Sequence, residues 1–274
     1  MKQLTHQLKQ AINENTSLLA ALYVAKYFDD AIDINAYLQK VQTMVESCRF
    51  AMREALTEQN KFRRVVDHFY RTLAFSGNEQ DYFASKYSLI TQVIDFRTGI
   101  PVSLSIVFNH IASQLGFNVK GVNFPGHFLI RYDLDEERSY FIDPLTGQFL
   151  SYSALQALYS GVLDGVDGDE MPEEALDRAT LPETIVRIVN NLKSSFIQEK
   201  RFHQALLSVE LLIELQPDDP YTRRDRGFLL HQLDCEHFAV ADYQYFIKHC
   251  PKDPSAQMLK LQIKKLQPVE YVLH

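Results

Sequence analysis

The N-terminal part of the chain carries apolar residues at helical spacing. A stretch that contains Val41, Val45 and Cys48 shows this most clearly. Residues three or four positions apart share one face of an α-helix, so we predict helices up to the turn signal at residues 76–78. Because Cys48 lies on an apolar face, we expect it to be a buried, structural thiol.

Residues 98–150 have a different pattern. Pro101 follows a turn and is placed at the first position of a helix, where the N–H that proline lacks is not needed. The apolar face of this helix continues to a C-cap at Gly116, and His110 on the other side is expected at the surface. Three short strands are predicted next, at 117–122, 127–133 and 139–142. A helix followed by an antiparallel meander indicates an α+β fold, here mainly helical.

An acidic segment follows this block. Residues 164–177 read DGVDGDEMPEEALD and contain no basic residue. Their acids and glycines lack the spacing of a calcium loop, so a solvated connector at a domain boundary is the preferred interpretation. We therefore predict an N-terminal part at 1–163, an acidic linker at 164–180 and a C-terminal part at 181–274.

The C-terminal part contains an internal repeat. The motifs PDDP at 217–220 and PKDP at 251–254 are 34 residues apart, and so are Ala205 and Ala239. A 34-residue period, with small residues where helices cross and proline after the second helix, is typical of tetratricopeptide repeats. The expected elements are repeats at 186–219 and 220–253 and a capping helix at 255–266.

Three polar residues of the second repeat are candidates for binding a peptide. Arg223 and Arg224 lie near the start of its first helix, and His231 follows on the same helix. They are suited to an acidic or C-terminal peptide segment on the concave face of the repeats. Neighbouring aspartates, such as Asp225, are an alternative, internal partner for the arginines.

Composition and charge narrow the possible partners. The chain is 46% hydrophobic and 23% charged, which is typical of a globular protein, and its net charge is −7. Direct nucleic-acid binding is not expected, because it requires a basic face. No apolar run approaches the length of a membrane span, and the polar N-terminus does not resemble a signal peptide, so no membrane association is expected.

The cysteines and histidines predict neither disulfides nor a metal site. Three scattered cysteines suit a reducing compartment, and we expect a cytoplasmic protein. The His and Cys residues of the second repeat fit no common zinc spacing, and these are His231, Cys235, His237, His249 and Cys250. No metal or other cofactor is therefore predicted.

The central block resembles a known enzyme core. Residues 99–133, GIPVSLSIVFNHIASQLGFNVKGVNFPGHFLIRYD, and 140–147, YFIDPLTG, are similar to the transglutaminase-like core. Together with the repeats and the ending YVLH at 271–274, they resemble the bacterial SirB-one-type family. The resemblance implies a papain-like arrangement, with a nucleophile at the start of the central helix and a histidine and an aspartate on adjacent strands. His127 and Asp143 match the last two positions.

The nucleophile position departs from the pattern that the resemblance implies. Pro101 stands where active relatives have cysteine, and the nearest hydroxyls belong to Ser103 and Ser105. A serine gains little from a helix dipole and needs a base and an oxyanion hole. We therefore favour a non-catalytic, cytoplasmic interaction or regulatory protein whose partner, a peptide or a protein, binds the C-terminal repeats or the groove at the position of the ancestral active site. The alternative is an acyl-transfer enzyme, an amidase, protease or transglutaminase-like protein, that uses Ser103, His127 and Asp143.

Overall fold

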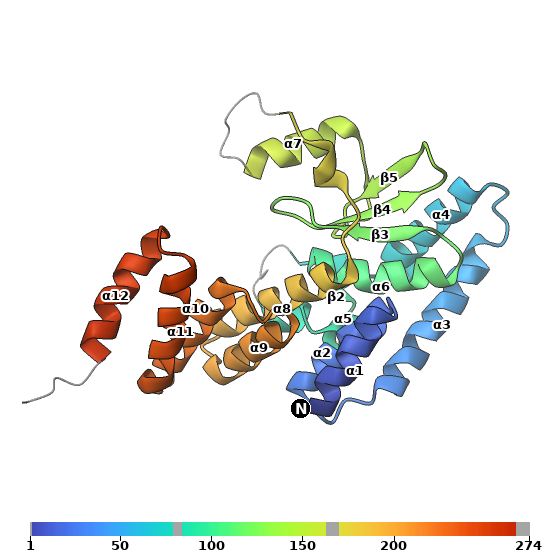
Figure 1. Cartoon of the computed structure of the whole chain (residues 1–274). Helices are drawn as coiled ribbons and strands as arrows, with labels where there is room; N and C mark the ends of the chain where they lie inside the picture. Colours follow the sequence, from blue (N-terminus) through green and yellow to red (C-terminus); the bar gives the residue numbers. More distant parts are fainter. Residues whose placement is uncertain (1, 79–83, 163–169, 267–274) are drawn as a thin grey trace, which may run out of the picture. The chain divides into compact units, whose positions relative to one another are not determined.

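The computed structural model describes residues 2–78, 84–162 and 170–266 (Figure 1). The chain divides into two compact units, Met1–Ile188 and Val189–His274. The ending 271–274 lies outside the described residues.

Unit 1 is built around one buried helix, α6 (Pro101–Gln114). Every residue of α6 from Pro101 to Phe108 is buried, as expected for a core helix that is apolar on all sides. It packs between the sheet and three of the helices that precede it in the sequence. The three are α2 (Ser17–Phe28), α3 (Ile34–Met52) and α5 (Ile90–Phe96). The other two helices that precede α6 are α1 (Lys2–Asn13) and α4 (Glu58–Asp67).

The sheet of unit 1 is an antiparallel meander with the order β3-β4-β5-β6. Its strands are β3 (Val119–Val122), β4 (Leu129–Asp133), β5 (Ser139–Ile142) and β6 (Phe149–Leu150). Val122 pairs with Leu129, and Ile130 pairs with Ile142. Helix α6 covers one face of the sheet, and α7 (Tyr152–Val162) covers the other (Figure 1).

These elements confirm the predicted mainly helical α+β fold and the buried position of Cys48. The structure adds β6 and a two-residue parallel pair, β1 (Ser76–Gly77) with β2 (Thr98–Gly99). Strands of two residues are too short to produce a periodic pattern, which is why the sequence did not predict them.

Part of the segment predicted as an acidic linker packs onto unit 1. Residues 164–169 lie outside the described residues, but Met171 is buried with Val122 and Leu155 beside the sheet. Further along, the N–H of Ala179 donates to the carbonyl oxygen of Gly121 at 2.8 Å. Residues 170–180 are therefore a packed part of unit 1 and not a free connector.

Unit 2 consists of antiparallel helices. Helix α8 (Leu181–Gln198) crosses the division between the units, and α9 (Phe202–Leu215), α10 (Pro220–Gln232), α11 (Glu236–His249) and α12 (Pro254–Leu266) follow. Ala205 and Ala239 are fully buried. A Cβ atom at Gly227 would lie 2.6 Å from the ring of Tyr243, so only glycine allows this close approach of α10 and α11. The predicted pair of repeats and the last helix are confirmed.

Candidate functional site

The start of α6 is the position where the resemblance places a nucleophile. Pro101 is the first residue of the helix and is buried. Ser103 is also fully buried, and its hydroxyl is directed at the backbone. It donates to the carbonyl oxygen of Tyr87 at 2.7 Å, and the carbonyl oxygen of Ile100 lies within hydrogen-bond distance of it at 3.0 Å. The hydroxyl oxygen of Ser103 also accepts the N–H of Ile100 at 3.1 Å. The Ser103 hydroxyl thus closes the first turn of α6.

His127 and Asp143 lie side by side near the sheet. His127 precedes β4, Asp143 follows β5, and Nε2 of the histidine is 3.2 Å from Oδ1 of the aspartate. Each side chain is about one-fifth exposed, at 19% and 21%. Burial raises the pKa of Asp143, but hydrogen bonds from His127, the N–H of Leu145 and the hydroxyl of Thr146 outweigh it, so the pKa falls below its usual value. Asp143 therefore orients the imidazole and also closes the turn that follows β5.

The structure does not connect Ser103 to this pair. Within the described ranges, no hydroxyl or thiol is hydrogen-bonded to the His127 ring, whose partner is Asp143. The Ser103 hydroxyl is engaged by Tyr87 and Ile100. The site thus provides a histidine oriented by a carboxylate, without a hydroxyl nucleophile bonded to it.

A second carboxylate near the sheet has a structural role. Asp133 is buried at the end of β4, and it is bound by Arg131 at 2.8 Å, by Arg178 at 2.5 Å and by the hydroxyl of Ser139. Because Arg178 belongs to the segment that follows α7, these bonds fix that segment on unit 1.

The three candidate peptide-binding residues all lie on α10. Arg223 Nη1 is 3.8 Å from Asp242, and Arg224 forms the predicted internal ion pair with Asp225 at 3.0 Å. The Nε atom of Arg223 and the Nδ1 atom of His231 are buried and have no hydrogen-bond partner among the described residues. Both nitrogens therefore have hydrogen-bonding capacity that the described residues leave unsatisfied.

His110 does not lie free at the surface as the sequence predicted. It is half-buried and lines a cavity with Ser105 and Asn109. Burial lowers its pKa. The available signal was the spacing of Ser105 and Asn109, because two polar residues four positions apart on a helix lie on one face. Lys120, from β3, lines the same cavity as these three residues of α6. The sequence did not predict that they lie together.

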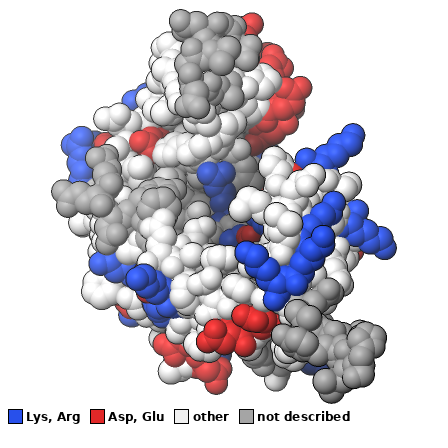
Figure 2. Space-filling view, turned by 90° about the vertical axis from the view of Figure 1, so that its left-hand side faces the viewer, with Lys and Arg blue, Asp and Glu red and all other residues white. Residues whose placement is uncertain are grey.

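No three His, Cys, Asp or Glu side chains within 2–78, 84–162 and 170–266 are placed to hold a metal ion. No helix in the same ranges is long and apolar enough to cross a membrane. The face in Figure 2 carries both basic and acidic side chains, and neither sign covers it.

The chain is similar to known families along most of its length. Residues 35–190 match the transglutaminase-like superfamily, and residues 192–264 match the tetratricopeptide repeat. A UPF0162 protein of Vibrio cholerae is 36% identical over 223 residues, which cover 81% of this chain and 82% of the relative. UPF0162 protein PM0557 of Pasteurella multocida is 33% identical over 84% of this chain and 86% of its own length.

Protein SirB1 of Salmonella typhimurium is 30% identical over 235 residues, or 86% of this chain and 87% of the relative. No solved structure matches the chain. The buried helix with its sheet and the paired C-terminal helices agree with these similarities. The chain belongs to the transglutaminase-like superfamily and, within it, to the family of SirB1 and the UPF0162 proteins.

Proposed function

We propose that this protein is a non-catalytic, cytoplasmic binding protein that takes an acidic or C-terminal peptide segment of a partner on helix α10. The observation that supports the proposal is the start of α6, where the resemblance places a nucleophile: Pro101 is the first residue of the helix, and the hydroxyl of Ser103 is bonded to the backbone. A histidine oriented by a carboxylate needs a nucleophile within hydrogen-bond reach to begin acyl transfer.

The repeats supply the binding surface of the proposal. Tetratricopeptide arrays bind partners on extended concave surfaces. On α10, Arg223 and His231 each have a buried nitrogen without a partner among the described residues, and Arg224 lies over the ring of Tyr221 at 5.1 Å. Cations and ring N–H groups in this arrangement suit a carboxylate. The three free cysteines are consistent with a reducing, cytoplasmic compartment.

Acyl transfer is the second candidate function, and the His127–Asp143 pair at 3.2 Å is the observation that favours it. The full chain is incubated with a fluorophosphonate probe and a fluorogenic glutamine amide. We expect neither labelling at Ser103 nor turnover above that of the Ser103→Ala variant. Labelling that disappears in Ser103→Ala, with turnover that disappears in a folded His127→Ala variant, would establish the enzyme instead.

Peptide binding is tested by fluorescence anisotropy. The probes are acidic decapeptides with a free C-terminal carboxylate and the same peptides with a C-terminal amide. We expect saturable binding that weakens about tenfold, or about 1.4 kcal/mol, in Arg224→Gln and in His231→Ala. Arg201→Gln, which removes a charge at the turn before α9, is the matched control and should leave affinity unchanged. Equal affinity in all variants would disprove the assignment to α10.

A further inference from the structure

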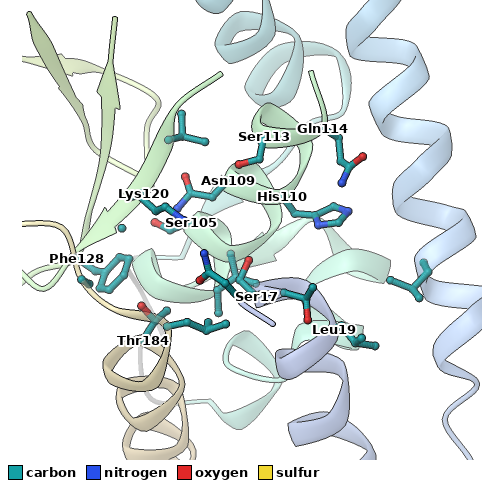
Figure 3. A pocket seen from close by; sticks show the side chains of 18 residues that line it. Ser17, Leu19, Ser105, Asn109, His110, Ser113, Gln114, Lys120, Phe128 and Thr184 are labelled. Atoms are coloured by element: carbon teal, nitrogen blue, oxygen red, sulfur yellow. The ribbon is translucent and has the colours of Figure 1, made fainter. Parts of the chain in front are cut away.

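A cavity of about 330 Å³ lies within unit 1, on the side of α6 that carries His110 (Figure 3). Its walls come from five elements: the start of α2, helix α3 through Leu38, helix α6, strand β3 and the start of α8. This volume lies within the range of small-molecule sites. The residues already assigned to the candidate catalytic and peptide-binding sites are not among those that line it.

Two polar groups of α6 at this cavity are buried without partners. Ser105 is fully buried, and its hydroxyl has no hydrogen-bond partner in the described part of the chain. The Oδ1 atom of Asn109, one turn further along α6, is also buried and also has no hydrogen-bond partner among the described residues. Leaving such a group unsatisfied costs about 1–3 kcal/mol, so two on one wall of a cavity need an explanation. A ligand that completes their hydrogen bonds supplies one.

The charge of the cavity favours an anion. Lys120 is half-buried at the cavity, and its side-chain ammonium group forms no ion pair or hydrogen bond with the residues that the structure describes. None of the described lining residues is Asp or Glu. Burial lowers the pKa of His110, so this ring stays neutral near pH 7 and adds no second positive charge. The residues that line the cavity thus carry a net charge of one positive unit, which matches a monoanion better than a dianion.

The start of α2 adds hydrogen-bond donors. Thr16, the N-cap residue, makes no side-chain bond to the helix, because its hydroxyl donates to the carbonyl oxygen of Ala11 at 2.9 Å. The first N–H groups of a helix have no partner within it, and here the cap does not satisfy them. Ser17 and Leu19, from this first turn, line the cavity. The uncapped end of a helix carries partial positive charge and favours an anionic oxygen.

The rest of the lining is apolar. Ile106, Phe128 and Leu181 contribute hydrocarbon surface to the lining. The ring of Phe128 is labelled in Figure 3. We propose that this cavity binds a small organic acid with one carboxylate, a hydroxyl group and an apolar body. The carboxylate is bound by Lys120, Ser105 and the start of α2, the hydroxyl donates to Asn109 Oδ1, and the apolar body contacts Phe128.

The test uses the full chain and 2-hydroxyisocaproate as the probe, measured by isothermal titration calorimetry and by saturation-transfer NMR. The comparison probes are its primary amide, which lacks the charge, and inorganic phosphate. We expect saturable binding of the hydroxy acid, and affinity at least tenfold weaker for the amide. Lys120→Met and Ser105→Ala should each weaken binding about tenfold, or about 1.4 kcal/mol. Lys264→Met, at an exposed lysine of α12, is the matched control and should not change it.

Ser105→Ala separates binding from folding, because the lost hydroxyl has no intramolecular hydrogen bond to lose. Lys120→Arg retains the charge and should keep most of the affinity if Lys120→Met proves poorly folded. The proposal is overturned if the probe fails to bind at about 10 mM, where a free energy of roughly −3 kcal/mol would register. It is also overturned if phosphate binds in its place, or if Lys120→Met and Ser105→Ala both bind like the unmodified chain.

Discussion

The Ser103→Ala substitution removes a buried hydroxyl at the start of α6, and we expect it to destabilise the fold without affecting a reaction. The hydroxyl donates to the carbonyl oxygen of Tyr87 at 2.7 Å and accepts the N–H of Ile100 at 3.1 Å. Each buried hydrogen bond contributes about 0.5–1.5 kcal/mol net. The N–H of Ile100 also donates to Tyr87 at 3.2 Å and keeps that partner, so the expected loss is about 1–2 kcal/mol.

A matched control lies two positions along the same helix. Ser105 is equally buried, but its hydroxyl has no hydrogen-bond partner among the described residues. The Ser105→Ala variant therefore loses no intramolecular bond, and its free energy of unfolding should stay within about 0.5 kcal/mol of the unmodified chain or rise. The two variants make the same chemical change on one helix and differ only in hydrogen bonding.

Differential scanning calorimetry of the full chain measures both variants, which is convenient because the chain has no tryptophan to report by fluorescence. A loss of 1 kcal/mol lowers the unfolding midpoint of a domain of this size by about 2–4 °C. Ser103→Ala should therefore unfold several degrees below Ser105→Ala. Equal midpoints would refute the structural role of the Ser103 hydroxyl, and so would an acyl-transfer activity that only Ser103→Ala removes.

Three further predictions concern other buried groups. Burial raises the pKa of Asp133, but hydrogen bonds from a hydroxyl and two arginines outweigh this effect and lower the pKa below its usual value. The ionised carboxylate therefore stabilises the fold above about pH 4, and this stabilisation is lost as the pH falls through the lowered pKa. Asp133→Asn should thus cost about 2 kcal/mol at pH 7 and much less near pH 2, by calorimetry. Gly227→Ala should destabilise unit 2 by about 1–3 kcal/mol in urea unfolding, because the added Cβ meets Tyr243 at 2.6 Å. Burial raises the pKa of the Cys48 thiol to about 12, so iodoacetamide at pH 8 should alkylate exposed Cys235 and spare Cys48, by peptide mass mapping.

Each of these has an outcome that contradicts it. An Asp133→Asn penalty that stays constant from pH 7 to pH 2 would show that the charge of the carboxylate is not what stabilises the fold. For Gly227→Ala the control is Gly161→Ala in α7, where an added Cβ meets nothing within 4 Å and helix propensity favours alanine by up to about 1 kcal/mol. Equal effects at the two glycines would contradict the close approach of α10 and α11. Alkylation of Cys48 in the folded chain at the rate of Cys235 would contradict its burial.

The sequence by itself determined the elements and their order. Periodic apolar positions mark which side of each helix or strand is buried, and this information is local, so α6, strands β3, β4 and β5 and the repeat helices follow from it. Pro101 at the first position of α6 and the small residues Ala205 and Ala239 at the helix crossings were also readable, because the backbone restricts such positions directly. The family resemblance rested on these same local features.

The tertiary structure alone decided how distant residues meet. The bond from Ser103 to Tyr87 joins side chain and backbone sixteen positions apart, and no local pattern specifies it. The cavity beside Lys120 and Asn109 likewise needs five elements to be packed before it exists. Residues 170–180 read as a solvated connector from their charge, yet packing buries Met171 against the sheet. Local periodicity encodes which face of an element is apolar, whereas partners for polar groups depend on where the whole chain brings the other elements.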